Sequence, residues 1–443
     1  MRAIAFVFAV FGWLSGLVAS ASAQTPKPDY PTAYALATAS YCAYAVGPKF
    51  EGKEQPDNGQ DLAFRCVEAA GHRDPTLAKL GFTLRSKDDV FVSPPTGQGV
   101  AAGLTGGDGI DGFLLLDTPM GVVLAFRGTL LPPVSPDDPG DAKLGEVAKK
   151  AFLREKAREA WGAFLTDWFN NAFVQVDARQ RHSGFDESWG RLREVLKPDC
   201  VAGAPAAGKF CAFLAEKNGT RPTLFVTGHS KGGALATLAG LDLAAALPNV
   251  PQRVFTFAAA KSVAIAAATT PAYSSRALWR FERAGDLVPT LPTDDSLPFL
   301  AQWSELSKLD PLGWARKLSP YGHFGPRVLY VDGKPSAIAL PQGGRDAPDD
   351  WTRWRDIAKM DAPALLLFLK SRTLQIDGKF ECPLVTDHLA IFADVQASAW
   401  PGGAPPAGVD AKSGHFFQYG LRDDDGKSVL PGYRDWCNWL NAF

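Results

Sequence analysis

The chain has 443 residues, of which 46% are hydrophobic and 21% are charged, an ordinary globular composition with enough chain for a large core. The formal net charge of −1 gives no reason to expect nucleic acid or a broadly anionic surface as a partner. One large domain with insertions is favoured over a division into three domains.

Residues 1–23 have the pattern of a cleaved signal peptide. Arg2 is a minimal positive region, Ala3 to Val18 is apolar, and Ala21-Ser22-Ala23 fits an A-x-A cleavage site. A membrane anchor is the alternative, but the apolar run is short for a bilayer span and small residues follow it. We therefore expect an exported protein, secreted or periplasmic, with no transmembrane segment in the mature chain.

Six cysteines lie after the predicted cleavage site, and no C-x-x-C spacing indicates a zinc site. An even number of cysteines in an exported chain is typical of disulfides, although free buried thiols are the alternative. Sequence order favours the pairs Cys42–Cys66, Cys200–Cys211 and Cys382–Cys437, one of fifteen possible connectivities.

Residues 24–109 are predicted to form a helical and loop segment that packs on a core domain, 110–443. Asp29 to Val46 has the pattern of a helix rich in small and aromatic residues. Residues 97–112 are rich in glycine, but no helix follows as a phosphate-binding loop requires, so we expect a plain loop.

Two apolar runs, 113–116 and 122–126, flank a Pro/Gly turn and predict a β-hairpin. Leu144 to Trp168 then shows apolar residues at helical spacing. This pattern indicates either a lid over an active site or a packed surface helix. Later strands alternate with helices and favour an α/β fold with a mostly parallel sheet flanked by helices. Insertions are expected near 131–168, 294–318 and 341–378.

The clearest chemical signal is the pentapeptide Gly228-His229-Ser230-Lys231-Gly232, which fits G-x-S-x-G. An apolar strand precedes it and a helix-forming stretch follows, the context of a nucleophile elbow. There the serine is exposed on a sharp turn, and free N–H groups at the helix start can bind an oxyanion. The alternative is that the pentapeptide is an ordinary turn with no catalytic role. The side chain of His229 is expected to point away from Ser230.

A serine nucleophile needs a base and a carboxylate that orients the base. Asp286, in a loop after a predicted strand, is the best acid; Asp242 lies on the elbow helix. Asp294 and Asp295 lie in a proline-rich loop. The histidines after the elbow are His323, His388 and His415, and chain order does not choose among them.

Several blocks between about residues 110 and 395 form a recognisable set: VVLAFRGT (122–129), LTDW (165–168), HSGFDESW (182–189), VTGHSKGGALATLAGLDL (226–243), DLVPTLP (286–292), YGHFG (321–325) and TDHLAIF (386–392). In sequence and order these blocks resemble the class 3 lipases, the fungal-type triacylglycerol lipases of the α/β-hydrolase superfamily. The resemblance is specific in those blocks only.

The resemblance implies that Ser230 is the nucleophile, Asp286 the acid and His388 the base. It places His323 in a non-catalytic block, and His323 stays as the alternative base. The resemblance also implies that the N–H groups of Thr129 and Lys231 form the oxyanion hole. Two features depart from the family. Lys231 stands where an apolar residue is usual, and residues 258–264 differ from the usual G-x-P-R-x-G.

The prediction is an exported serine hydrolase that cleaves carboxylic esters of lipids through an acyl-enzyme, with no cofactor or metal. Its partner would be a lipid ester, met at a lipid–water interface if residues 144–168 are a lid. A phospholipase or short-chain esterase with the same triad is the first alternative. An inactive hydrolase-fold binding protein is the second.

Overall fold

A computed structural model describes residues 27–46, 49–50, 58–93, 96–98, 107–129, 179–200, 208–216, 220–268, 277–286, 288–290, 321–339, 374–376, 379–381, 383–400, 402, 404–407, 409 and 414–430. The predicted signal peptide, helix 144–168, the insertions 131–168 and 294–318, most of 341–378, and the pair Cys382 and Cys437 lie outside these residues. These features stay predictions, as does the division into 24–109 and 110–443.

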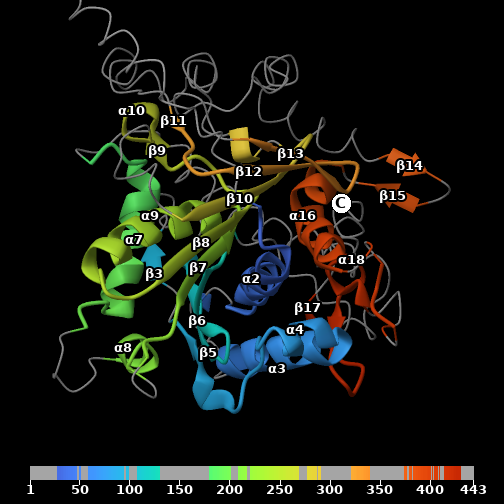
Figure 1. The fold of residues 1–443 in the computed structure, drawn as a ribbon, viewed down its shortest axis with the longest axis horizontal. Coiled ribbons are helices and arrows are strands. Elements are labelled where there is room, and N and C mark those ends of the chain that lie inside the picture. Colours follow the sequence, from blue (N-terminus) through green and yellow to red (C-terminus); the bar gives the residue numbers. More distant parts are fainter. Residues whose placement is uncertain are drawn as a thin grey trace, which may run out of the picture.

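An eight-stranded sheet forms the centre of the molecule (Figure 1). From one edge to the other its strands are β13 (Lys334–Ala339), β12 (Arg327–Val331), β10 (Leu278–Arg283), β8 (Gln252–Phe257), β7 (Leu224–His229), β6 (Gly121–Phe126), β5 (Phe113–Thr118) and β2 (Val90–Val92). The strands from β12 to β6 are parallel, and β13, β5 and β2 pair antiparallel. The hairpin predicted at 113–126 is confirmed as β5 and β6.

Helices cover both faces of this sheet (Figure 1). They are α2 (Tyr30–Cys42) and α16 (Pro383–Ala399) on one face, and α7 (Ser183–Leu196) and α9 (Lys231–Ala246) on the other. Successive residues of a strand point to opposite faces. Leu114 and Leu116 accordingly join the α2–α16 core, whereas Phe113 and Leu115 join the α7–α9 core. The mostly parallel sheet flanked by helices confirms the predicted α/β-hydrolase fold.

Helix α2 is buried from Ala33 to Cys42. Asp29 caps its start, because its carboxylate accepts from the Thr32 N–H at 3.2 Å. Small side chains let the helix lie close to the sheet, and the buried Ser40 hydroxyl shares a hydrogen bond of 2.9 Å with the Thr227 hydroxyl of β7. The helix predicted at 29–46 is therefore a core element of the fold.

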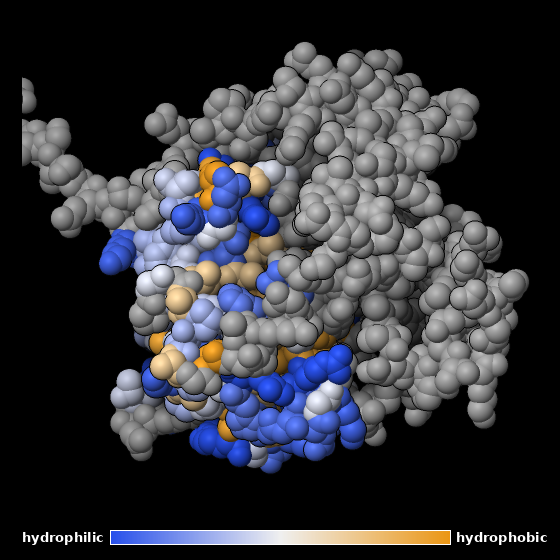
Figure 2. All heavy atoms as spheres, turned by 90° about the vertical axis from the view of Figure 1, so that its right-hand side faces the viewer, coloured by the Kyte–Doolittle hydropathy of each residue, from blue (hydrophilic) through white to orange (hydrophobic). Residues whose placement is uncertain are grey.

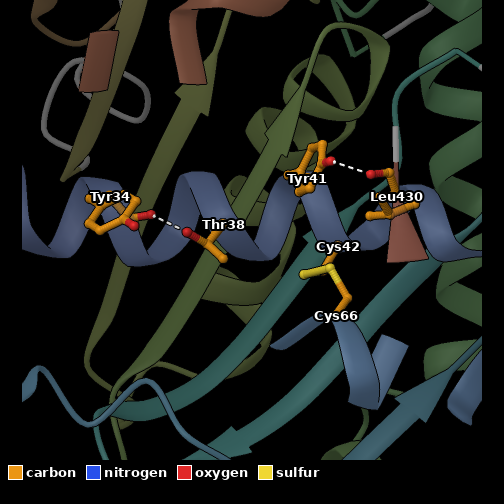
Figure 3. The surroundings of a disulfide bond; sticks show 6 residues. All are labelled: Tyr34, Thr38, Tyr41, Cys42, Cys66 and Leu430. Atoms are coloured by element: carbon orange, nitrogen blue, oxygen red, sulfur yellow. Dashed lines mark hydrogen bonds between the residues drawn. A yellow bond between two sulfur atoms is a disulfide. The ribbon is translucent and has the colours of Figure 1, made fainter. Parts of the chain in front are cut away.

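Two disulfides join helices, one on each face of the sheet. Cys42–Cys66 links the end of α2 to α3 (Asn58–Arg73), as Figure 3 shows. Cys200–Cys211 links the segment after α7 to α8 (Lys209–Phe213). Both pairs were expected from sequence order and are confirmed.

The glycine-rich stretch 97–112 is not a plain loop. It contains part of β3 (Thr96–Gln98) and all of β4 (Gly107–Asp111), which pair antiparallel in a small separate sheet with β1 (Lys49–Phe50). Backbone pairing overrides the weak strand propensity of glycine and aspartate here. The correction matters because β4 ends at Asp111, a buried carboxylate beside the elbow.

The described part of the face drawn in Figure 2 is mostly hydrophilic. Figure 2 shows one face, on which apolar side chains occupy small areas among polar ones. Of the large apolar side chains in the described ranges, Val331 is the exposed one, at 40%. Within the part of the chain that the structure describes, every helix is too short or too polar to cross a lipid bilayer.

Candidate active site

Ser230 lies at the turn between strand β7 and helix α9. Its backbone has φ 59° and ψ −128°, a conformation that residues other than glycine rarely adopt. Its N–H donates to the Phe257 carbonyl oxygen at 2.9 Å, and its own carbonyl accepts from the Gly233 N–H at 3.0 Å. The surrounding backbone therefore holds the serine in this strained conformation. The strand, turn and helix are those that the G-x-S-x-G motif predicts.

The two glycines of the motif are required by close backbone packing. A Cβ at Gly228 would lie 2.8 Å from the Gly233 nitrogen, and a Cβ at Gly232 would lie 2.8 Å from the Arg127 carbonyl carbon. Side chains at either position would separate α9 from β7 or from the segment after β6. The turn that exposes Ser230 could not then close in this geometry.

Three of the candidate residues follow the carboxyl ends of parallel strands. Thr129 follows β6, Ser230 follows β7 and Asp286 follows β10. Because parallel strands end at one edge of a sheet, these residues share the edge at which α/β folds bind their ligands. His388 reaches the same edge from α16.

Asp286 and His388 contact each other directly. The distance between His388 Nδ1 and Asp286 Oδ2 is 2.9 Å, and the other Asp286 oxygen accepts from the Val288 N–H at 3.0 Å. The Asp286 side chain is 1% exposed, whereas the His388 side chain is 16% exposed. A carboxylate accepts hydrogen bonds, so Nδ1 of His388 carries the proton and Nε2 is left as the proton acceptor.

In the described part of the chain, Ser230 has no direct hydrogen bond to this pair, and the preceding residue, His229, is the one that contacts His388. Among the described residues, no hydrogen bond joins the Ser230 hydroxyl to the His388 ring. The ring of His229, the preceding residue, lies 4.3 Å from the His388 ring, measured between centroids. Catalytic hydrogen bonds are often long without substrate and shorten in the substrate complex, so the arrangement suits a serine, base and acid constellation.

The alternative candidates have other partners. His323 Nε2 donates to the Pro289 carbonyl oxygen at 2.8 Å and lies 4.0 Å from Glu282. Asp242 accepts from Arg181 and from the Trp189 indole N–H at 2.8 Å. Asp294 and Asp295 lie outside the described residues. Among these candidates, His388 and Asp286 are the histidine and carboxylate that contact each other.

Sequence comparison links part of the chain to a known family. Residues 156–296 match the family model described as Lipase (class 3). This match supports the resemblance of the chain to the class 3 lipases. Comparison with curated proteins gives no match.

Solved lipase structures are similar to the chain at low identity. Triacylglyceride lipase from Rhizomucor miehei is 17% identical, with 76% of this chain and 99% of that chain covered and a TM-score of 0.33. A lipase from Rhizopus microsporus var. chinensis is 16% identical, with 73% and 88% covered and a TM-score of 0.35. LIP2 lipase from Yarrowia lipolytica is 16% identical, with 72% and 89% covered and a TM-score of 0.34.

Lys231 is the departure from the class 3 pattern that the structure explains best. Its side chain is buried, with Nζ 2.8 Å from Asp111 Oδ1, while Arg191 lies 3.0 Å from the other Asp111 oxygen. Burial raises the pKa of the Asp111 carboxyl, but the charges of Lys231 and Arg191 outweigh it and hold that pKa below its ordinary value. The lysine thus reaches a buried acidic group in the interior.

Both candidate oxyanion donors, Lys231 and Thr129, are buried. Lys231 follows Ser230 in the chain, and Thr129 follows β6, the strand next to β7 in the sheet. Lys231 is the first residue of α9, where backbone N–H groups have no acceptor within the helix. Thr129 is 7% exposed and follows Gly128, whose added Cβ would lie 2.7 Å from the His229 carbonyl oxygen. The segment that carries Thr129 therefore lies directly against the elbow.

Sequence reasoning did not predict the contacts of His229. Its Nδ1 lies 2.8 Å from the Tyr44 hydroxyl, and its Nε2 lies 3.0 Å from the His388 carbonyl oxygen. Burial, with the neighbouring His388 as a second cause, holds the pKa of His229 well below its ordinary value. The only sequence signal was the aromatic content of the helix at 29–46, because Tyr44 is 185 residues away.

A cavity of about 200 Å³ lies away from these residues, between the second half of α9 and the first residues of β8 and β10. Gly240, Val254 and Leu278 are among the residues that line it. In the described ranges, no three His, Cys, Asp or Glu side chains are grouped so that they could hold a metal ion. No described residue is therefore assigned to a metal.

Proposed function

We propose that the protein is an exported serine hydrolase that cleaves carboxylic ester bonds of lipids, with Ser230, His388 and Asp286 as its triad. The observation that carries the proposal is the 2.9 Å contact between His388 and Asp286 at the sheet edge where Ser230 occupies the elbow. The match of residues 156–296 to the class 3 lipase model supports a lipase-type ester hydrolase.

In the proposed reaction, the Ser230 hydroxyl oxygen attacks the ester carbonyl carbon while Nε2 of His388 takes the hydroxyl proton. The tetrahedral intermediate collapses, His388 protonates the leaving alcohol, and an acyl-enzyme remains. Water then attacks the acyl carbon, gives its proton to His388, and the acid is released as the proton returns to Ser230. Asp286 keeps the His388 ring oriented and stabilises it when it is charged.

Negative charge develops on the carbonyl oxygen during both attacks. We assign the backbone N–H groups of Thr129 and Lys231 to that oxygen. Removal of one such donor typically costs about 10²- to 10³-fold in kcat. The Lys231 side chain is not needed for this role, because its amine is paired with Asp111 in the interior.

Export is supported by the chemistry of the cysteines. The two disulfides Cys42–Cys66 and Cys200–Cys211 belong to an oxidising compartment. This agrees with the signal peptide predicted at residues 1–23, and both point to a secreted or periplasmic enzyme.

The test is hydrolysis of a soluble p-nitrophenyl ester by the mature protein and four variants. Ser230→Ala and His388→Ala should lower kcat by about 10⁴-fold or more, and Asp286→Asn by a similar factor. His323→Gln, which retains a donor for the Pro289 carbonyl, should keep kcat within about tenfold. Unchanged hydrolysis by Ser230→Ala would overturn the proposal.

The same proteins distinguish the substrate classes. A lipase whose active site is covered by a lid should hydrolyse an aggregated triacylglycerol faster than a monomeric ester. Preference for phosphatidylcholine vesicles would indicate a phospholipase, and preference for the monomer a short-chain esterase. Folded wild-type protein with no activity on any of them would favour the inactive binding protein.

A further inference from the structure

Tyr44, from the N-terminal part of the chain, reaches the candidate active site from the α2 face of the sheet. We propose that Tyr44 and His229 are positioning residues that anchor the backbone of His388 and so hold its ring in place for Ser230. The inference rests on the proposed function and deepens it, because it makes the N-terminal segment part of the site.

The connection runs through two hydrogen bonds in series. Tyr44 lies in a short 3-10 turn, η2 (Ala43–Ala45), directly after α2. Its hydroxyl is 2.8 Å from His229 Nδ1, and His229 Nε2 is 3.0 Å from the His388 carbonyl oxygen. His229 is 0% exposed, so water does not compete for either nitrogen.

The direction of both bonds follows from the acceptors. A carbonyl oxygen only accepts, so His229 Nε2 must carry a proton. Burial keeps the imidazole neutral, and a neutral ring carries one proton, so Nδ1 is the acceptor. Tyr44 therefore donates to His229, and His229 donates to His388. Loss of the tyrosine hydroxyl would remove this donor from Nδ1 and leave that side of the ring without its hydrogen bond.

The Tyr44 hydroxyl also lies against the segment that carries Thr129. A Cβ added to Gly128 would overlap this hydroxyl, and it would lie 3.1 Å from the Tyr44 Cζ atom. The hydroxyl thus touches the segment after β6 and the last residue of β7. Through His229 it is joined to α16. One group contacts or connects all three segments that carry Thr129, Ser230 and His388.

Tyr44 is itself held on both sides. Two residues before it, Cys42 forms the disulfide to Cys66 (Figure 3). Two residues after it, the Val46 carbonyl oxygen accepts from the buried Arg127 guanidinium. The turn is therefore fixed to α3 and to the end of β6, and it can serve as a rigid support.

Such a support acts on the rate because the base must lie within hydrogen-bond reach of Ser230. A displacement of about 1 Å can cost about 100-fold in rate. The His388 ring is fixed by Asp286 at Nδ1, while its backbone is fixed by His229. The carboxylate sets the rotation of the ring, and the backbone bond sets its position along α16.

The test compares two tyrosine variants that each lose one hydrogen-bonded hydroxyl. Tyr44→Phe should lower kcat for ester hydrolysis about tenfold with KM unchanged. Tyr41→Phe is the matched control, because Tyr41 lies one turn earlier and donates to the Leu430 carbonyl at 3.2 Å, as Figure 3 shows. Tyr41→Phe should lower the denaturant midpoint of unfolding about as much as Tyr44→Phe does, but it should leave kcat unchanged.

Two substitutions of His229 separate its bonds. Gln can place an amide N–H near the position of Nε2 and keep the bond to His388, whereas Asn can place an oxygen near Nδ1 and keep the bond to Tyr44. We expect His229→Gln to retain several-fold more kcat than His229→Asn at equal folded fraction by circular dichroism. The reverse order, or equal kcat, would overturn the inference.

Wild-type controls separate this inference from the proposed function. If folded wild type hydrolyses the ester and Ser230→Ala does not, the proposed function stands. Wild-type kcat in Tyr44→Phe would then overturn the positioning role alone. If wild type is inactive, or if Ser230→Ala is active, the proposed function fails and the inference fails with it.

Discussion

Ions hold the start of α9, whereas neutral hydrogen bonds hold the backbone of His388. On the α7–α9 face, Lys231 and Arg191 are both paired with the buried Asp111. On the α2–α16 face, Tyr44 and His229 connect to the His388 carbonyl. Buried ion pairs are costly to break because they leave an unpaired charge, while one neutral hydrogen bond is worth much less. Substitutions near Ser230 should therefore mainly lower stability, and substitutions near His388 should mainly lower the rate of ester hydrolysis.

The largest effect is expected at Asp111. Asp111→Asn leaves the Lys231 ammonium buried without its counter-charge and should lower the free energy of unfolding by about 3–5 kcal/mol. Urea unfolding at pH 7 measures it. Glu187→Gln is the control, since Glu187 pairs with the same Arg191 but has a 73% exposed side chain, so its loss should cost no more than about 1 kcal/mol. Equal losses would show that burial does not decide the strength of the pair.

The two disulfides give a second comparison between the faces. Replacing either pair by serines should cost about 3 kcal/mol of unfolding free energy, since the two loops span 24 and 11 residues. Only the loss of Cys42–Cys66 should also lower kcat, because it loosens the turn that carries Tyr44. Denaturant unfolding and ester hydrolysis on both variants test this. If the variant that lacks Cys200–Cys211 lost as much kcat as the variant that lacks Cys42–Cys66, this expectation would be contradicted.

The smallest effect is a pH dependence from His229. Its pKa is depressed in the folded protein, so below about pH 6.5 the unfolded chain binds a proton that the folded chain does not. Stability therefore falls as pH falls, by about 1.4 kcal/mol per pH unit from this group. The slope of unfolding free energy between about pH 6.5 and 5 should be smaller in His229→Gln by that amount. Parallel curves for the two proteins would show that His229 does not titrate differently on folding.

The elbow could be predicted from sequence because its determinants are local. The strand, the strained serine, the two glycines and the helix lie within Leu224–Ala246, and each follows from residue type at short spacing. The parallel strands and two disulfides were likewise predicted from apolar runs and cysteine order. Asp286 was favoured by its place after a strand, but His388 was chosen over His323 by the family resemblance.

The supports of the site could not be predicted, because they join distant parts of the chain. His229 contacts the backbone of a residue 159 positions away, and Tyr44 is 185 positions from His229. The partner of Lys231, Asp111, ends a strand in a stretch interpreted as a loop, since Gly and Asp carry little strand propensity. These contacts join residues far apart in the chain, and such contacts leave no periodic pattern in the sequence from which they could be predicted.

The most direct test is to label the folded mature protein with a fluorophosphonate and map the adduct by mass spectrometry. An activated serine should give a single adduct on the peptide that contains Ser230. It should be absent in Ser230→Ala, strongly slowed in His388→Ala and unchanged in His323→Gln. No adduct on folded wild type, or an adduct that persists in Ser230→Ala, would contradict the assignment of Ser230 as the nucleophile.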